Sequence, residues 1–443
     1  MSSLPTELWS AAFDYLDLDD LIAAAHVSAI WRLISFDHPT FWRDVSISST
    51  SSSSLALAEH RLGEAKQRPW HLNLRLLKDE DTLSEPRLVL LLHRYLPYAR
   101  RIIMRIRASD ADDAWTLLSA PAPALEHCDI TAALSPGQSP PSLPRDLFAE
   151  VAPRLYKLLL QDITLPTASV AAFSFVESAT LRSPRSAWEV FPYHLLTIFP
   201  CLRSLTMAGG CVDFRGPVPH VIERGLSALR YFDIEYYSGE SLKFFRSLPC
   251  QRIPLLLVAY PDDDSVLAAL QHLQCQRYRV LIVPTVGGEF HIEFRPDSHD
   301  GGTTQGLCRI FAEIVDDYES DDPLHNIMFK QPDIAAKITA LSLATSLWPM
   351  ISRVMQPLPE VTSLRIIIDN GRDGCAEIPQ DHLRCPQLQL LCLASSCGFV
   401  RVSPDDVVAL VPRLTSRYVK LELDGVALNG ALSSDSLYFS ELE

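Results

Sequence analysis

The chain has 443 residues, of which 47% are hydrophobic, and it carries a net charge of −15. This length and apolar content predict packed domains rather than disorder. The acidic balance argues against a general affinity for nucleic acid or for an anionic membrane, because those partners require clustered lysine and arginine. The first residues lack a basic segment followed by an apolar core, and the longest apolar runs fall well below the ~20 residues that a membrane helix needs. We therefore expect an intracellular protein, cytoplasmic or nuclear.

Short helices are predicted over residues 1–45. Leu4, Pro5 and Leu8 open the first of them, and a proline suits a first turn because its missing N–H would have no partner there. Further apolar residues recur at helical spacing. These residues are Phe13, Leu16, Leu21, Ile22, Val27, Ile30, Trp31 and Ile34. Helices this short can bury only a fraction of that apolar surface.

The order of these residues resembles the F-box family. The matching positions are Leu4, Pro5, Glu7, Leu8, Phe13, Leu16, Asp20, Leu21, Val27, Trp31, Arg32, Pro39, Trp42 and Val45. The sequence departs from the family at Ala12, Ser28 and Ala29, where a bulkier aliphatic residue, a cysteine and a basic residue are usual. The resemblance implies docking to the Skp-family adaptor of a cullin ubiquitin ligase. The adaptor-binding residues it implies are Leu4, Pro5, Glu7, Leu8, Phe13, Leu16, Leu21, Val27, Trp31 and Trp42.

A polar tract, SISSTSSSS at residues 46–54, follows the helical start. Its low complexity predicts a linker. The next residues, from Leu55 to Lys66, have the pattern of one helix, and the leucines that follow Pro69 alternate as in a strand. We therefore expect a second domain over residues 55–443.

A degenerate repeat runs through this second domain, with the spacing apolar, two residues, apolar, one residue, apolar. Its middle positions fall at Ile103, Cys128, Leu158, Ala179, Leu205, Phe232, Leu256 and Leu281, which by subtraction are 21 to 30 residues apart. After a longer gap, the pattern resumes at Leu341, Leu364, Leu391 and Leu421. This period is typical of leucine-rich repeats, in which each strand joins a parallel sheet and stacking buries the apolar face.

Helices are predicted just ahead of several strands, near Trp115, Leu195, Leu267 and Val407. The fold class expected is therefore α/β, a short all-α module followed by a leucine-rich-repeat-like solenoid with a parallel sheet. Residues 285–332 are the expected irregular insertion, because glycine pairs and an acidic segment at 313–322 interrupt the repeat. The acidic segment lacks the spacing of a calcium loop, which favours a solvated loop. The EFHIEF stretch within the insertion predicts an extra strand.

Strand alternation also predicts the concave face of the solenoid. In ARRIIMRIR, residues 99–107, it places Arg101 and Arg105 on the face opposite Ile102, Met104 and Ile106. An acidic or phosphorylated target segment could pair with these guanidiniums. The alternative is that they are solubilising charges neutralised by neighbouring acids. The residues expected on the concave face are Arg101, Arg105, Lys157, Tyr231, Asp233, Arg365 and Lys420, and the candidate target contacts among them are Arg101, Arg105, Tyr231, Asp233 and Arg365.

Sequence motifs of enzymes are missing. No GxGxxG, GxxxxGK[ST], GxSxG or HExxH occurs, and the 10 cysteines form no CxxC pair. We expect no catalytic residue, cofactor or metal, although an unfamiliar active site stays open. An F-box followed by irregular repeats resembles the large F-box families of mushroom-forming fungi. This resemblance implies a receptor that holds an unidentified protein target for ubiquitin transfer. The alternatives are an adaptor-binding protein that forms no ligase, and an enzyme with an unrecognised site.

Overall fold

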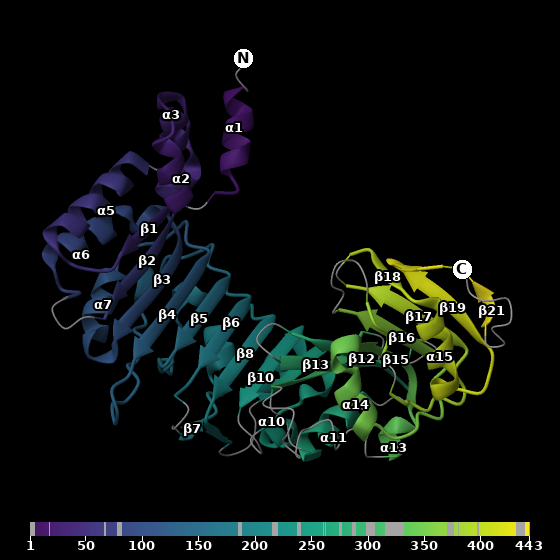
Figure 1. The fold of residues 1–443 in the computed structure, drawn as a ribbon. Helices are drawn as coiled ribbons and strands as arrows, with labels where there is room; N and C mark the ends of the chain where they lie inside the picture. The colour runs from purple at the N-terminus through teal and green to yellow at the C-terminus, as the bar shows by residue number, and fades with distance from the viewer. Residues whose placement is uncertain are drawn as a thin grey trace. The chain divides into compact units, whose positions relative to one another are not determined.

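The computed structural model describes residues 5–16, 18–65, 68–77, 82–184, 188–214, 220–236, 241–259, 261, 263–273, 277–285, 289–297, 306–314, 332–369, 376–379, 381–396, 398–430 and 439–442. The chain divides into two compact units, residues 1–228 and residues 229–443. Each unit contains strands that pair mostly in parallel, together with helices (Figure 1). The expected class, a short helical start followed by an α/β solenoid-like fold, is confirmed.

Short helices form the start of the first unit. They are α1 (Thr6–Phe13), α2 (Leu18–Ala25), α3 (Ala29–Asp37) and α4 (Pro39–Arg43). Phe13, Leu21, Ala24 and Ile34 form their buried core, and Trp31 packs against it with its ring centroid 5.6 Å from that of Phe13. The hydroxyl of Ser28 accepts a hydrogen bond from the Trp31 amide and so caps α3. The apolar spacing read from the sequence thus marks real helices around a small core.

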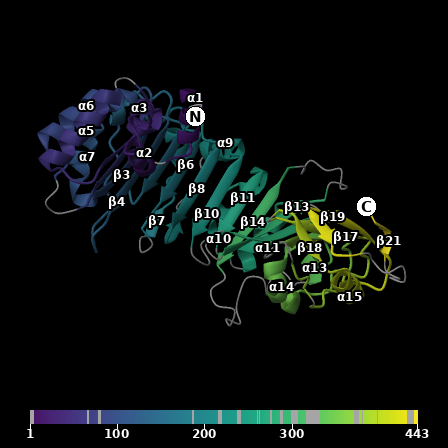
Figure 2. The ribbon, with the colours of Figure 1, turned by 45° about the horizontal axis from the view of Figure 1, so that its top comes forward.

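The strands of the first unit pair in parallel and in chain order. They are β1 (Asp44–Ile47), β2 (Trp70–Leu76), β3 (Ala99–Arg107), β4 (His127–Ala133), β5 (Lys157–Gln161), β6 (Ser178–Arg182) and β8 (Ser204–Gly209). Alternate residues of each strand are buried. Figure 2 shows α5 (Ser52–Ala65), α6 (Pro86–Tyr95) and α7 (Ala111–Leu117) lying together beside the first strands. The remaining residues of each strand are less buried and lie on the opposite face of the sheet. We call this face the open face.

The remaining elements of the first unit are short. They are the 3₁₀ turns η1 (Leu96–Tyr98), η2 (Ala108–Asp110), η3 (Leu147–Glu150) and η4 (Ala171–Phe173), the helices α8 (Leu195–Ile198) and α9 (His220–Ala228), and the paired strands β7 (Trp188–Val190) and β9 (Cys211–Asp213). The helices expected near Trp115 and Leu195 are therefore confirmed as α7 and α8.

The serine tract is not a separate linker over its whole length. Its first two residues, Ser46 and Ile47, belong to β1, which pairs with β2, and its last three begin α5. Val45 and Ile47 are buried, so β1 is part of the packed sheet. The hydroxyl of Ser51 accepts a hydrogen bond from the Ser54 amide at the start of α5. Serine is common at helix starts for this reason. The linker prediction, which was based on low complexity, did not take this capping role into account.

Strand register confirms most of the repeat positions. Cys128, Leu158, Ala179 and Leu205 lie in one row across β4, β5, β6 and β8, and all are buried. The position assigned to Ile103 was wrong by one residue, because Ile102 pairs with Cys128 and points inward. Three consecutive apolar residues in β3 satisfy the repeat in either register, so the pattern alone could not choose between them.

The second unit has a mixed sheet. In sheet order its strands are β10 (Tyr231–Tyr236), β11 (Leu255–Ala259), β14 (Cys308–Ile314), β13 (Glu289–Pro296), β12 (Tyr278–Pro284), β15 (Ile338–Ala344), β16 (Ser363–Ile368), β17 (Leu390–Ser395), β19 (Val419–Asp424) and β21 (Phe439–Leu442). Neighbours are parallel except around β13, which is antiparallel to both β12 and β14. The row Leu341, Leu364, Leu391 and Leu421 is aligned and buried, as the repeat predicts.

Short helices and turns connect these strands. They are α10 (Ser241–Ser247), η5 (Cys250–Arg252), α11 (Asp263–Gln271), α13 (Pro332–Ala335), η7 (Thr345–Leu347), α14 (Trp348–Val354) and α15 (Pro404–Leu414), with a small pair of strands β18 (Val400–Val402) and β20 (Val426–Leu428). The helices expected near Leu267 and Val407 are therefore confirmed as α11 and α15.

The insertion expected at residues 285–332 departs from the repeat in an ordered way. Its EFHIEF stretch forms β13, as predicted, and β13 and β14 extend the sheet between β11 and β12. The positions Leu256 and Leu281 are thus not on neighbouring strands, and Val280 rather than Leu281 takes the buried position that pairs with Leu341. Beyond residue 314, the acidic segment lies outside the described residues, as do the glycine pairs at 287–288 and 301–302.

Truncation at two points tests whether β1 belongs to the sheet. A chain starting at Asp44 keeps β1, whereas a chain starting at Ser51 loses the two buried side chains of Val45 and Ile47 and exposes the edge of β2. Burial of each such side chain stabilises a fold by ~1.5–3 kcal/mol. We expect both chains to fold by near-ultraviolet circular dichroism, with the shorter one melting about 5 °C or more below the longer. Equal melting temperatures would show that β1 contributes nothing to the sheet.

Candidate partner-binding surfaces

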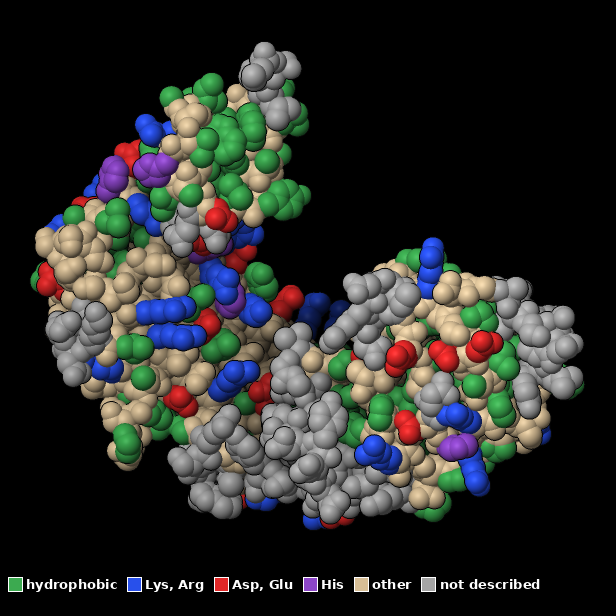
Figure 3. All heavy atoms as spheres, viewed as in Figure 1, with side chains coloured by type: hydrophobic (Ala, Val, Ile, Leu, Met, Phe, Trp, Pro, Cys, Tyr) green, Lys and Arg blue, Asp and Glu red, His purple; other side chains and the backbone are tan. Residues whose placement is uncertain are grey.

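Large apolar side chains are exposed on α2, α3 and the turn between them. Ile22, Val27, Ile30, Leu33 and Phe36 are 41%, 64%, 62%, 73% and 45% exposed. Ile30, Leu33 and Phe36 follow each other at three-residue spacing, which places them along one side of α3. Figure 3 shows apolar side chains gathered on this helical start. We call these five residues the apolar helical face, and exposed apolar clusters of this kind mark interaction sites.

The residues that the F-box resemblance implies fall into different environments. Pro5, Glu7, Leu8 and Val27 are exposed, whereas Leu16, Trp31 and Trp42 are partly buried, Phe13 and Leu21 are in the core, and Leu4 lies outside the described residues. Phe13 and Leu21 therefore support the helices rather than present a surface. Sequence reasoning did not single out Ile22, Ile30, Leu33 or Phe36 as surface residues. The available signal was that α2 and α3 hold more apolar residues than so small a core can bury.

An apolar groove of about 610 Å³ adjoins this face. Ile22, Phe36, Phe41 and Trp42 line it on one side, and residues of α5, including Leu57, line it on the other. The indole N–H of Trp42 donates a 2.5 Å hydrogen bond to the Phe36 carbonyl, which holds the ring at the groove. Arg61 of α5 donates to the Phe41 carbonyl at 2.6 Å. The first bond holds α4 against α3 and the second holds it against α5, so the groove is a preformed continuation of the apolar helical face.

The open face of the first unit carries clustered cations. Strand register places Arg101, His127 and Lys157 in one row, and Arg75 and Arg105 in a second row four residues further along the strands. Figure 3 shows lysine and arginine side chains gathered over the middle of this unit. We call the cationic side chains Arg75, Arg101, Arg105, Lys157 and Arg182 the basic face.

The cations of the basic face act on Asp129 and His127, which stand among them. Burial raises the pKa of Asp129, and Arg105 and Arg101 oppose that rise. Burial also lowers the pKa of His127 to about 4, with Arg101, Lys157 and His71 acting in the same direction. His127 is therefore neutral at physiological pH, and the positive charge of the open face comes from its lysine and arginine side chains.

The neutral state of His127 makes the stability of the protein depend on pH. The pKa of His127 is depressed to about 4 in the folded chain, against 6.5 ordinarily, so between these values the unfolded chain binds the proton more tightly. The stabilisation is complete above pH 6.5 and is lost as the pH falls through about 4. We expect His127→Gln to reduce the loss of unfolding free energy between pH 7 and pH 4.5, measured by urea titration. His26→Gln, at an exposed position, is the matched control, and an unchanged pH dependence in the His127 variant would contradict this assignment.

The other candidate target contacts belong to the second unit. On β10, the Tyr231 hydroxyl donates a 3.1 Å hydrogen bond to the carboxylate of Asp233, and burial together with that carboxylate raises the pKa of Tyr231. Asp233 is buried, so it positions Tyr231 rather than meeting a partner itself. On β16, Arg365 is exposed and pairs with Asp424 at 2.5 Å. The structure therefore assigns Arg101 and Arg105 to one unit and Tyr231, Asp233 and Arg365 to the other.

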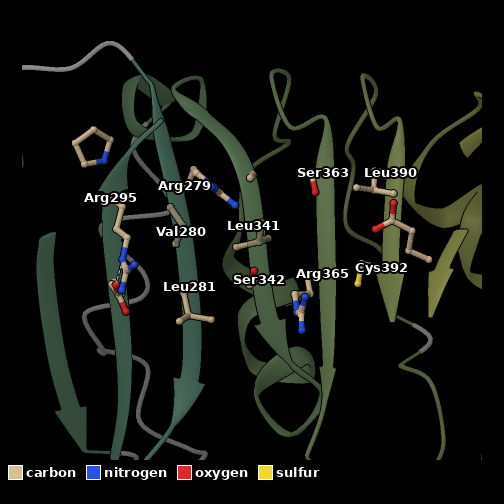
Figure 4. A pocket seen from close by; sticks show the side chains of 14 residues that line it. Arg279, Val280, Leu281, Arg295, Leu341, Ser342, Ser363, Arg365, Leu390 and Cys392 are labelled. Carbon is tan, nitrogen blue, oxygen red and sulfur yellow. Dashed lines mark hydrogen bonds and ion pairs between the residues drawn. The ribbon is translucent and has the colours of Figure 1, made fainter. Parts of the chain in front are cut away.

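A pocket of about 470 Å³ opens on the sheet of the second unit (Figure 4). Small side chains, Ala340, Ser342 and Ser363, lie on its central strands, and Arg279 and Arg365 lie among the residues that line it. Because small residues leave space above β15 and β16, the pocket can receive one side chain of a partner. Cys392 also lines it, but burial raises the pKa of its thiol, which keeps the sulfur protonated and unreactive.

Within the described residues, no group of three or more His, Cys, Asp and Glu side chains is arranged to hold a metal ion. In the same part of the chain, no helix has both the length and the apolar character required to cross a membrane. The described surfaces offer apolar and cationic contacts to a partner.

Comparison with known proteins bears on the helical start. Residues 1–48 match the F-box-like family. No match is found among curated proteins. The matched range covers α1 to α4 and the whole of β1, in agreement with the packing of β1 after the helices. The match and the short helices with their exposed apolar face together identify an F-box-like domain at residues 1–48 of this chain.

Proposed function

We propose that this protein is the substrate-recognition subunit of a cullin-type ubiquitin ligase. Its F-box-like domain docks the Skp-family adaptor, and its sheets hold a protein target. The observation that carries the proposal is the apolar helical face, formed by Ile22, Val27, Ile30, Leu33 and Phe36 inside the range that matches the F-box-like family. F-box proteins in general are adaptors without catalytic activity, and we assign this chain no reaction of its own.

Energetic reasoning supports adaptor binding at this face. Stable protein interfaces bury ~1,200–2,000 Å² in total, and aromatic or large aliphatic side chains at their centre supply most of the binding energy. The five side chains of the face, with the adjoining groove, provide such a centre. Burial of these side chains against an adaptor would remove an apolar surface that is otherwise in contact with water.

The remainder of the chain supports a role in holding a target. We interpret it as a leucine-rich-repeat-like solenoid, because successive strands place buried leucines in register. Its combination with an F-box-like domain resembles the F-box families expanded in mushroom-forming fungi. Such strands present their open-face residues in rows, and these rows provide a broad surface for a partner. The mechanism is proximity: the receptor raises the local concentration of the target at the site where other subunits transfer ubiquitin. We place this activity in the cytoplasm or nucleus.

Mutation of the apolar helical face tests adaptor binding. Ile30→Ala with Leu33→Ala removes two exposed side chains, so the fold should be retained while affinity for a Skp-family adaptor falls about 10-fold or more. Phe399→Ala with Tyr418→Ala, which truncates two exposed side chains of the second unit, should bind as the native chain does. Isothermal titration with purified adaptor measures both variants. If the Ile30, Leu33 variant binds the adaptor with native affinity, the apolar helical face is not the docking surface.

A second candidate is an adaptor-binding protein that forms no ligase. Both candidates use the F-box-like domain to bind the adaptor. Only assembly with a cullin therefore distinguishes them. If the chain is a ligase subunit, a complex reconstituted from this protein, adaptor and cullin should elute as one species in size-exclusion chromatography. The Ile30, Leu33 variant should fail to enter it. An adaptor complex from which cullin is excluded would favour the second candidate.

A further inference from the structure

We infer that the basic face of the first unit binds an extended acidic segment of a protein, through carboxylate or phosphate groups. The inference deepens the proposed function by naming the chemistry of the target, and it rests on that function only for the source of the segment. Cations stand on β2, β3, β5 and β6 of one parallel sheet. The chain as a whole carries a net charge of −15, so this concentration of positive charge runs against its composition.

Three cations of the basic face have no acidic partner within the part of the chain that the structure describes. Arg101, Arg105 and Lys157 are exposed, and among the described residues none of them makes an ion pair. The open-face acids of β1 to β6 are Asp44 and Asp129. Asp44 already contacts His71 at 2.9 Å and Arg43 at 3.3 Å. Asp129 is a single, half-buried carboxylate among several cations, and it cannot neutralise them all.

The spacing of the cations matches that of an extended peptide. Neighbouring parallel strands lie ~4.8 Å apart, so Arg101 on β3 and Lys157 on β5 stand about 10 Å apart across the sheet. Arg101 and Arg105 are four residues apart on β3, about 13 Å along the strand. Alternate residues of an extended peptide project to one side every ~6.6 Å, so acidic groups four residues apart match the spacing of the two arginines. Guanidinium forks hold carboxylate and phosphate by paired hydrogen bonds.

The charge pattern of the face favours a peptide over a nucleic acid as its ligand. A nucleic acid offers phosphates too, but it carries one at every nucleotide, and a chain with a net charge of −15 has no broad excess of cations to match them. Asp44 and Asp129 at the margin and centre of the face also oppose a continuous phosphate backbone. A peptide can place its acidic residues over the cations and neutral residues over the aspartates. An acidic protein segment is therefore the partner that this charge pattern favours.

Direct binding of synthetic peptides to the full chain tests the inference. The probes are three fluorescein-labelled 12-residue peptides: one alternating Glu with Ser, one with phosphoserine and Gln in alternation, and one with Gln in place of every Glu. We expect anisotropy to show binding of at least one of the first two and none of the third, with affinity falling as salt is raised. Binding of the phosphoserine peptide alone assigns phosphate as the ligand group, and binding of the Glu peptide assigns carboxylate.

Charge reversal locates the site. Arg101→Glu with Arg105→Glu should weaken binding of the acidic probe about 10-fold or more, because like charges then face the ligand. Arg145→Glu with Arg154→Glu makes the same change of net charge at exposed positions outside the strands, and it should bind as the native chain does. Circular dichroism of all variants controls for folding. Equal weakening in both variants would show that net charge alone causes the effect, and it would contradict binding at the basic face.

Other binding results would reject the inference or assign the basic face to another ligand. Failure of the native chain to bind either acidic peptide, or equal binding of the Gln peptide, overturns the inference. Tighter binding of a 12-nucleotide single-stranded RNA in the same assay assigns the face to nucleic acid instead. Adaptor affinity, measured on the same proteins, keeps the two proposals distinct. Retained adaptor binding with no peptide binding rejects only the acidic segment, whereas peptide binding without adaptor binding rejects the proposed function and leaves the site.

Discussion

Burial of one apolar row by the next is the constraint on which both units depend. A single strand with its connection cannot hide its own inward side chains, so Leu364 is buried only because Leu341 and Leu391 flank it in register. A slip of one residue would turn these leucines to the open face and bring polar residues inward. The inward row thus also fixes which side chains are presented outward, and the basic face is a by-product of packing on the other side of the same strands.

The sequence predicted more of the architecture than of the surfaces. Repeated leucines at a steady interval were sufficient to predict the row through Leu341 and Leu421, because burial and spacing agree there. They were insufficient at Ile103, where adjacent apolar residues allow two registers, and at Leu281, where the preceding strand in sequence, β11, pairs with β14 and not with β12. Pairing partners are a long-range property, and local periodicity carries no information about them.

The F-box pattern alone did not show which of its residues are exposed. The F-box pattern includes core positions such as Phe13 and Leu21 beside exposed ones such as Leu8, since a motif records what a domain requires for folding and for binding together. Exposure separates the two roles, and exposure depends on how α1 to α4 pack. The exposed residues Ile30 and Leu33 therefore emerged only once the helices were seen side by side. On the strands, alternation identified Arg101 and Arg105 directly, because a pleated backbone leaves only two directions.

The strand pair β13 and β14 acts as a spacer within the second unit. It stands between β11, which neighbours β10 with its Tyr231, and β12, which neighbours β15. Two extra strands move every later strand by about 10 Å across the sheet without altering a single repeat. Lengthening or deleting such a hairpin is a discrete change that alters the distance between contact groups on its two sides. A solenoid of this kind can therefore adjust the reach of its recognition surface in steps of whole strands, while its leucine rows stay as they are.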